Sequence, residues 1–335
     1  MTKPTLKSIA EQLDLTPTTI SRVLSGKGDQ YRISQQTQKR IRELAERLNY
    51  SPDHIARGLR LKKTSTIALI VPDIANPYFA TIAHHITAEA RKRGHSVLLS
   101  DSQENTQQEI DAIKVMESRN VDGMIICPVG DSSTHLEKFV DGSKPVVLAD
   151  RYYKELNIPS VSSDNTSGAR EATEYLLDHG HRRIACLQGL PKSLPNQDRI
   201  AGYREALQEH FDEQLIVGDN FSKQSGYVAA RTLLRAEAKF TAIFALNNQI
   251  ALGALQALAE EGLGIPEDVS IITFDDFPYA EYLATPMTTV KQRNEEMGQI
   301  AAQMLFSQLD SQKASQGLLL PTQLIERASV RHLNA

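Results

Sequence analysis

One arginine stands among short hydroxyl side chains in the segment TPTTISRVLS, residues 16–25. If this segment is helical, Ile20, Val23 and Leu24 form an apolar face, and Arg22 lies on the opposite face. That outer face also carries Pro17, Thr18, Ser21 and Ser25. A guanidinium group donates two parallel hydrogen bonds to the edge of a guanine, and hydroxyl groups donate to phosphate oxygens. The residue types and their spacing therefore predict a surface that reads DNA.

A second set of polar side chains follows short apolar segments in the rest of the chain. It combines carboxylates, amides and arginines with aromatic rings: Tyr78, Phe79, Asp101, Asp150, Arg151, Asn196, Arg199, Phe244, Asn247 and Asp275. Sugar hydroxyls need paired donors and acceptors, and pyranose faces pack on aromatic rings, so we expect a sugar-like effector. A neutral sugar fits best, and a sugar phosphate or sugar acid comes second, because Arg151, Arg199 and Lys192 would accept an anionic group. The alternative is that the Asp and Asn residues only cap the helices that follow, which we expect for Asp276 and Asn248.

The remaining titratable residues do not support catalysis. His84 and His85 are adjacent, so on a helix they point about 100° apart, which suits neither a shared metal nor a proton relay. His179 and His181 flank Gly180 at an expected helix end, where cationic side chains satisfy backbone carbonyls. The chain has no serine or cysteine in a nucleophile elbow and no phosphate-binding glycine loop. We therefore expect no enzyme, no cofactor and no metal site.

Composition places the positive charge at one end of the chain. The net charge of the whole chain is −4, but residues 1–63 hold 13 Lys and Arg against 6 Asp and Glu, a net +7, which leaves −11 for the remainder. Phosphate neutralisation requires positive charge at the DNA-facing segment, as found here. Cys127 and Cys186 stand in apolar runs and are expected to be free buried thiols. No signal peptide and no apolar run of about 18 residues is recognisable, so we expect a cytoplasmic protein.

The arginine needs a small helical domain to hold it. Thr5 can cap a first helix that carries Leu6, Ile9, Ala10 and Leu13, and a tight link at residues 14–15 leads to Thr16, the N-cap of the second helix. A third helix over 34–48 closes the core with Ile41, Leu44, Ala45 and Leu48. This order predicts a helix-turn-helix whose second helix enters the major groove. The alternative is two packed helices of any small helical domain.

A further short helix is expected after this head. Ser51 and Pro52 form a second cap-and-proline start, and a helix to about Leu61 would place Ile55, Ala56 and Leu59 on one side, with Arg57 and Arg60 nearby. It is too short to persist alone, so it would order only against a partner. The alternative is a basic, solvated linker.

Beyond residue 64, short apolar runs alternate with amphipathic segments, which predicts parallel sheets with crossover helices in two similar lobes that divide near Asp164. The expected strands are 66–72, 96–100, 123–128, 145–150, 183–189, 214–218, 242–247 and 269–275. The expected helices are 78–93, 107–119, 165–180, 199–210, 225–236, 248–262 and 295–309. Ligands of such doubly wound sheets bind outside the carboxyl ends of the strands, here between the lobes.

The chain resembles the lactose/galactose-repressor family of transcription regulators over essentially its whole length. The resemblance rests on the order and spacing of TLKSIAEQLDLTPTTISRVLSGK, LNYSPDHIARGLR, TIALIVPDIANPYFATI, GHRRIACLQG, DRIAGYREAL, FALNNQIALGAL, GIPEDVSIITFDD and TPMTTVKQ. It implies an all-α head over 1–50, a hinge helix and linker over 51–63, and a periplasmic-binding-protein-like α/β core over 64–335. The lobes would exchange strands at 288–292 and 318–325, which gives lobe one about 64–163 and 292–325, and lobe two about 164–291 and 326–335.

The resemblance also implies roles for residues. Two chains would pair through their cores and place two heads on a near-palindromic operator, with Pro17, Thr18 and Arg22 on base edges. The expected phosphate contacts are Thr5, Thr16, Thr19, Ser21 and Tyr31, and the expected minor-groove contacts are Ala56, Leu59 and Arg60. In the family the positions of Arg199 and Asp275 grip the effector, which changes the angle between the lobes. The pair Asn247-Asn248 stands where the family commonly has Asn-Asp.

Three classes of protein fit some of these features. A ligand-responsive DNA-binding regulator uses both the head and the core, and it is the function we predict. A transport-related solute-binding protein would need a signal peptide, and a DNA-binding domain fused to a sugar-processing enzyme would need a phosphate loop or catalytic base. No heptad repeat follows the last expected strand, so we expect a homodimer rather than a tetramer held by a coiled coil.

Overall fold

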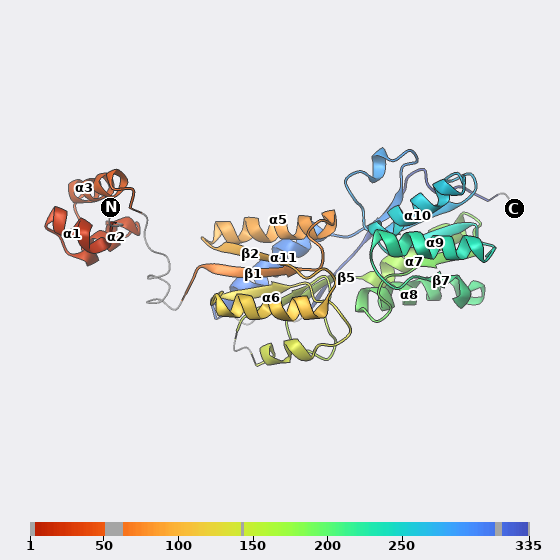
Figure 1. The fold of residues 1–335 in the computed structure, drawn as a ribbon, viewed down its shortest axis with the longest axis horizontal. Helices are drawn as coiled ribbons and strands as arrows, with labels where there is room; N and C mark the ends of the chain where they lie inside the picture. Colours follow the sequence, from red (N-terminus) through yellow and green to blue (C-terminus); the bar gives the residue numbers. More distant parts are fainter. Residues whose placement is uncertain (1–3, 51–62, 142–143, 312–316, 334–335) are drawn as a thin grey trace. The chain divides into compact units, whose positions relative to one another are not determined.

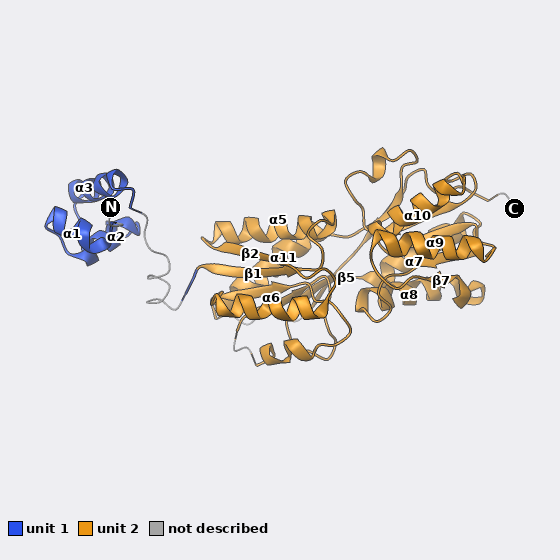
Figure 2. Cartoon of the chain, in the orientation of Figure 1, with its two compact units in different colours: residues 1–64 blue, residues 65–335 orange. Residues whose placement is uncertain are grey.

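The computed structural model describes residues 4–50, 63–141, 144–311 and 317–333. They belong to two compact units, the head (residues 1–64) and the core (residues 65–335), which Figure 2 distinguishes by colour. The expected hinge helix, with Ala56, Leu59 and Arg60, lies outside the described residues.

The head consists of α1 (Leu6–Leu13), α2 (Pro17–Leu24) and α3 (Gln35–Arg47). Each helix begins at a hydroxyl N-cap that accepts a backbone N–H, because the first turn of a helix leaves those donors unpaired. The caps are Thr5, Thr16 and Ser34. One side chain from each helix is fully buried at the centre: Ile9, Ile20 and Ile41. The three helices thus share one core, as the apolar spacing predicts.

In the described part of the core, twelve strands form two six-stranded sheets (Figure 1). The sheet of lobe one has the order β11-β5-β4-β3-β1-β2, and the sheet of lobe two has the order β12-β10-β9-β8-β6-β7. The strands of lobe one are β1 (Thr66–Val71), β2 (Ser96–Asp101), β3 (Gly123–Ile126), β4 (Val146–Ala149), β5 (Ser160–Ser163) and β11 (Leu318–Leu320). Those of lobe two are β6 (Ile184–Leu187), β7 (Ile216–Val217), β8 (Ala242–Ala245), β9 (Ser270–Phe274), β10 (Thr288–Lys291) and β12 (Gln323–Ile325). All neighbours run parallel except β10 and β12, so the strand ends that carry polar residues gather at one edge of each sheet.

Helices cover both faces of each sheet (Figure 1). In lobe one, α5 (Pro77–Lys92) and α11 (Asn294–Leu309) pack on one face, and α6 (Thr106–Ser118) with the 3₁₀ helix η1 (Thr134–Phe139) packs on the other. In lobe two, α9 (Lys223–Arg235) and α10 (Asn248–Glu260) pack on one face, and α7 (Asn165–Asp178) and α8 (Leu194–Leu207) on the other. Short 3₁₀ helices complete lobe two: η2 (Gln208–His210), η3 (Glu213–Leu215) and η4 (Ala280–Tyr282).

Two glycines let α9 and α10 approach closely. A Cβ atom on Gly253 would lie 2.0 Å from the backbone oxygen of Lys223, and one on Gly226 would lie 2.2 Å from that of Ile250. Only a residue without a Cβ fits at these positions. The N-termini of both helices are therefore fixed side by side at the strand-end edge of lobe two.

The structure corrects three details of the sequence analysis. Residues 160–163 form a strand that was not expected, because the segment SVSS lacks an apolar run although it is buried between β4 and β11. Helix α8 begins at Leu194 instead of residue 199. Residues 318–325 are not one return strand, because β11 belongs to lobe one and β12 pairs with β10 in lobe two. Lobe one therefore ends between 320 and 323, before the expected residue 325.

Cys127 and Cys186 are buried free thiols, each at or after the end of a central strand. No helix among the described residues is long and apolar enough to cross a membrane.

Candidate functional sites

The exposed face of α2 presents Arg22 beside an aromatic ring. Ile20 and Val23 point into the head, and Arg22 is exposed on the other face. The Arg22 guanidinium carbon lies 3.8 Å from the centre of the Tyr31 ring. This stacking restricts the guanidinium while leaving its N–H groups along the ring edge available to a base.

The hydroxyl groups expected at phosphates also shape the head. Thr5 Oγ1 accepts a hydrogen bond from the Ser8 amide at 3.1 Å, and Thr16 Oγ1 accepts one from the Thr19 amide at 3.2 Å. Thr16 and Thr19 also share a hydrogen bond between their hydroxyl oxygens at 2.9 Å. Capping uses the oxygen lone pairs, so the hydroxyl proton of Thr5 can still be donated to an anion. Pro17 and Thr18, the first two residues of α2, are exposed.

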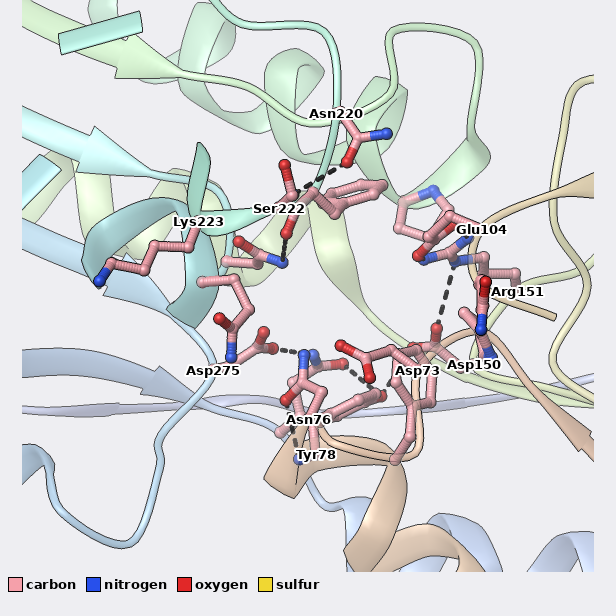
Figure 3. A pocket seen from close by; sticks show the side chains of 18 of the residues that line it. Asp73, Asn76, Tyr78, Glu104, Asp150, Arg151, Asn220, Ser222, Lys223 and Asp275 are labelled. Atoms are coloured by element: carbon pink, nitrogen blue, oxygen red, sulfur yellow. Dashed lines mark hydrogen bonds and ion pairs between the residues drawn. The ribbon is translucent and has the colours of Figure 1, made fainter. Parts of the chain in front are cut away.

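The core holds a cavity of about 420 Å³ between its lobes, a size within the usual range for small-molecule sites. Figure 3 shows Asn220, Ser222 and Lys223 of lobe two facing Asn76 and Tyr78 of lobe one. Of the predicted effector contacts, the structure brings these to the cavity wall: Tyr78, Phe79, Asp101, Asp150, Arg151, Arg199, Asn247 and Asp275.

Two predicted effector contacts do not reach the cavity. Phe244 is fully buried within β8 and packs on the face that α7 and α8 cover, because alternate side chains of a strand point to opposite faces. Asn196 is also buried, and its amide oxygen accepts a hydrogen bond from the Gly189 amide at 2.8 Å. It therefore holds the turn between β6 and α8.

Several residues of the wall were not predicted from the sequence. They come from loops that follow expected strands, from the first residues of the helices after those loops, or from the crossing between the lobes: Asp73, Gln103, Glu104, Asn220, Phe221, Ser222, Lys223, Gln249 and Gln292. Phe221 and Lys223 follow β7, so the strand-end rule pointed to them, but no residue after that strand was named. Gln292 follows β10, a strand inferred only from the family resemblance.

Close polar contacts connect the buried carboxylates of the two lobes, although the single proton of the Tyr78 hydroxyl can serve only one of its two acceptors. The Tyr78 hydroxyl donates to Asp150 Oδ1 at 2.6 Å and lies 3.1 Å from Gln292 Oε1. Gln292 Nε2 donates to Asp275 Oδ1 at 2.5 Å. Asp150 follows β4 of lobe one and Asp275 follows β9 of lobe two, so the crossing residue Gln292 connects equivalent positions of the lobes.

Both carboxylates stand on left-handed backbone. The φ angle is 65° at Asp150 and 74° at Asp275, a region that non-glycine residues seldom adopt and that Asp and Asn tolerate best. This conformation ends each strand abruptly and turns the side chain toward the cavity. Backbone strain of this kind gathers at functional sites.

The two arginines of the cavity are held differently. Arg151 forms a bidentate pair with Glu104, at 2.7 and 2.6 Å, and its guanidinium carbon lies 5.1 Å from the ring centre of Phe221 in lobe two. Arg199 donates from Nε to Asn165 Oδ1 at 2.8 Å and from Nη1 to the Leu246 carbonyl at 2.5 Å. Arg151 is thus neutralised within lobe one, whereas Arg199 is held by neutral acceptors.

Burial shifts the protonation of these groups. Desolvation raises the pKa of Asp150 and of Asp275, and the nearby arginines only partly oppose the shift. Desolvation also lowers the pKa of Arg199, against the attraction of Asp275. Burial acts to lower the pKa of Arg151, but Glu104 raises it above its ordinary value. Each carboxylate is therefore poised to gain from a ligand that donates hydrogen bonds to it.

This arrangement suits binding rather than turnover. The wall offers carboxylate acceptors, guanidinium and amide donors and the faces of Phe79 and Phe221, which together match a ligand rich in hydroxyl groups. Among the described residues, no three or more His, Cys, Asp or Glu side chains are grouped so that they could hold a metal ion. His181, expected as a cation at a helix end, is instead fully buried, and burial lowers its pKa to about 4.

Comparison with known proteins identifies both units. Residues 5–53 match the family model of bacterial regulatory proteins of the lacI family, and residues 64–328 match that of periplasmic binding proteins and the sugar-binding domain of the LacI family. The chain is 32% identical to the HTH-type transcriptional repressor CytR of Escherichia coli (strain K12) over 99% of this chain and 98% of the relative.

Solved structures match the whole chain or most of it. The crystal structure of the lac repressor dimer bound to operator and the anti-inducer ONPF matches with a TM-score of 0.86 and 26% identity, over 98% of this chain and all of that one. A LacI family transcriptional regulator from Enterococcus faecium with bound ribose matches with a TM-score of 0.71 and 30% identity, over 80% of this chain and 100% of that one.

Proposed function

Because the chain belongs to the LacI family of bacterial regulatory proteins, we propose that it represses transcription by binding operator DNA, and that a small polyhydroxylated effector in the core controls this binding. One observation carries the proposal: a ligand-sized cavity, walled by both lobes, stands on the same chain as a helix-turn-helix head. The relatives are regulators and not enzymes, so a fused sugar-processing enzyme is not retained. Repression of chromosomal genes would take place in the cytoplasm.

In the proposed DNA complex, α2 lies in the major groove. Arg22, stacked on Tyr31, reads a guanine, and Pro17 and Thr18 contact neighbouring base edges. The phosphate contacts are Thr5, Thr16, Thr19, Ser21 and Tyr31, and the minor-groove contacts are Ala56, Leu59 and Arg60. Two heads are needed for a near-palindromic site, so we propose a homodimer, the assembly named for the lac repressor structure.

In the proposed effector complex, the ligand is neutral and rich in hydroxyl groups. Arg151 pairs with Glu104 and lies 3.5 Å from Asp150, and the positive charge of Arg199 acts on Asp275, so the two arginines already balance part of the negative charge of the wall. A dianion would add negative charge to a wall that carries two buried carboxylates, which disfavours it. Ribose, the ligand of the Enterococcus faecium regulator, is of the neutral class.

The mechanism follows from where the contacts come from. An effector that touches both lobes binds one angle between them more tightly than another, and so shifts the population of lobe angles. The head is joined to lobe one at Thr64, next to β1, so a change in lobe angle would alter the separation of two heads in a dimer.

One experiment tests the effector class. The purified full-length protein is heated with a panel of neutral sugars, nucleosides, sugar phosphates and sugar acids, and the unfolding midpoint of the core is followed. A neutral polyhydroxylated compound should raise the midpoint, because a ligand at about 100 times its Kd stabilises by about 2.7 kcal/mol. Stabilisation by sugar phosphates alone would overturn the neutral class.

A second experiment tests the DNA function. Random duplexes are selected for binding to the full-length protein, and the bound sequences are read. We expect two inverted half-sites, and sedimentation should give a dimer at micromolar concentration. Selection of no motif, or a stable tetramer, would contradict the proposal.

A further inference from the structure

Two asparagine side chains bond to each other across the lobes. Asn76 Nδ2 donates to Asn248 Oδ1 at 3.3 Å, and Asn248 Nδ2 donates to Asn76 Oδ1 at 3.0 Å. The residues lie 172 positions apart, and only 5% and 1% of their surfaces are exposed. The pair is a closed ring of two hydrogen bonds in which each side chain both donates and accepts, which an amide can do and a carboxylate cannot.

Each asparagine is also tied to a predicted effector contact. Asn76 is the N-cap of α5, and its Oδ1 accepts the Tyr78 amide proton at 3.1 Å. Asn248 is the first residue of α10, and its backbone N–H points to Asp275 Oδ2 at 3.4 Å. The amide pair therefore joins the part of lobe one that holds Tyr78 to the part of lobe two that holds Asp275 (Figure 3 shows Asn76, Tyr78 and Asp275).

Other polar contacts also join the lobes. Gln292, in the crossing between them, lies 3.1 Å from the Tyr78 hydroxyl and donates to Asp275 Oδ1 at 2.5 Å, and both contacts are buried. Lys192 of lobe two pairs with Asp131 of lobe one at 2.8 Å, with side chains 75% and 51% exposed. Lys154 and Asp198 are 3.8 Å apart, and Lys154 is largely exposed. Exposed ion pairs contribute little because water and salt screen them. The amide pair is thus a buried polar contact that opening of the lobes would break.

We propose that Asn76 and Asn248 form a latch that holds the lobes together before effector binds. The latch sets the fraction of closed core, so an effector meets a wall in which Tyr78 and Asp275 already stand at their binding distance. This role goes beyond the proposed function, and only its consequence for operator binding rests on that function. Loss of the latch should favour the open core because both hydrogen bonds break together.

The variant Asn76→Asp tests the latch. Aspartate is as good an N-cap as asparagine, so the cap on Tyr78 is kept, but a carboxylate has no proton to donate to Asn248 Oδ1. The closed-to-open ratio of the effector-free protein should fall about tenfold, the effect of losing a buried hydrogen bond. Hydrogen exchange should therefore be about tenfold faster in peptides over the first turns of α5 and α10, while the exchange of the central strands stays unchanged.

Two matched variants serve as controls. Asn105→Asp makes the same exchange at the N-cap of α6, whose side chain accepts from the Gln108 amide at 3.0 Å within lobe one. Asp131→Asn removes an exposed ion pair between the lobes. Both should exchange as the wild type does.

A second latch variant guards against a general loss of stability. Asn248→Asp, made from the other lobe, should accelerate the same two peptides, because a carboxylate at this position cannot donate to Asn76 Oδ1. Exchange equal to that of Asn105→Asp in both single variants would overturn the latch. A clear exchange effect with unchanged operator affinity would leave the latch standing and contradict the proposed coupling to DNA.

Discussion

His181 gives a prediction whose size can be worked out. The residue follows Gly180 and leads into β6, and its ring is fully buried. Nε2 lies 3.2 Å from the Arg331 carbonyl oxygen, which can only accept, so Nε2 carries the proton. Nδ1 lies 2.8 Å from the Thr241 hydroxyl, which then donates to it. Both ring nitrogens are satisfied in the neutral form. A second proton, on Nδ1, would require the Thr241 hydroxyl to accept instead of donate and would place a positive charge in a buried site.

Burial lowers the pKa of His181 from 6.5 to about 4. Because this pKa is lower in the folded protein, the unfolded chain binds the proton first as the pH falls. The contribution of neutral His181 to the stability of the core is therefore present above pH 6.5 and is lost as the pH falls through 4. The full shift corresponds to about 3 kcal/mol, and the loss between pH 7 and pH 5 is about 2 kcal/mol. Acidification below pH 6.5 should therefore weaken the core.

The variant His181→Gln tests this prediction, because glutamine keeps an N–H near the position of Nε2 and cannot be protonated. Urea unfolding of the core is followed at pH 7 and pH 5. The wild type should lose about 2 kcal/mol more than the variant on acidification, whatever the variant loses at pH 7 through altered packing. His210→Gln, an exposed histidine of the same lobe, should keep the wild-type dependence. Equal losses in His181→Gln and the wild type would refute the assignment of a neutral buried ring.

Three further predictions concern DNA binding by Arg22, the buried charge of Asp275 and the packing of α9 against α10. Arg22→Ala should weaken binding to a selected operator by about 1–3 kcal/mol and affect random DNA much less, whereas equal losses in a binding assay would demote Arg22 to a phosphate contact. Asp275→Asn keeps the side-chain shape and the tolerance for positive φ. Burial raises the pKa of Asp275 above its value in the unfolded chain, so the folded wild type loses stability as the pH rises from the unfolded pKa to the raised one. The unfolding midpoint of the variant should therefore rise relative to that of the wild type between acid and neutral pH. A constant difference between the two midpoints would contradict this prediction. Gly253→Ala should destabilise the core by about 1–3 kcal/mol and weaken stabilisation by the effector, because its Cβ would clash with the Lys223 carbonyl and push α9 away from α10. Gly264→Ala is the control, and it should be milder because its Cβ would meet only side-chain atoms, the nearest at 3.3 Å. Identical unfolding midpoints for the two variants would argue against the clash.

The sequence predicted the elements well where one physical signal was strong. The helix-turn-helix was readable because Ile20 and Val23 stand three apart behind a Thr-Pro start, and the structure buries both. Most strands were found because parallel strands buried on both faces are runs of apolar residues. The strand Ser160–Ser163 was missed because it is not a run of apolar residues. Its hydroxyl groups are buried instead, and Ser162 Oγ donates to the Asp150 carbonyl at 2.5 Å.

The cavity was harder to predict because it depends on tertiary placement. The strand-end rule placed Asp150 and Asp275 in the wall, since a residue directly after a strand cannot turn far from its end. The rule did not place Phe244 in the wall, because the side chain of Phe244 points to the face of β8 that α7 and α8 cover. The sequence does not tell to which side a residue near the end of a strand points. Asn248 was expected to cap the helix that follows it, but the N-cap of α10 is Asn247, whose side chain accepts the Ile250 amide proton. No local pattern reveals that Asn248 bonds to Asn76.

The left-handed backbone at Asp150 and Asp275 limits how a protein of this architecture can acquire a new ligand. Glycine, asparagine and aspartate are the residues that adopt this conformation readily, and glycine would remove the side chain. Changes in ligand preference are therefore expected at neighbouring wall positions without a positive φ, such as Phe221 and Lys223, while the two acids are retained. A library that randomises those neighbours and spares the two acids should return more folded, ligand-responsive variants than one that randomises the whole wall.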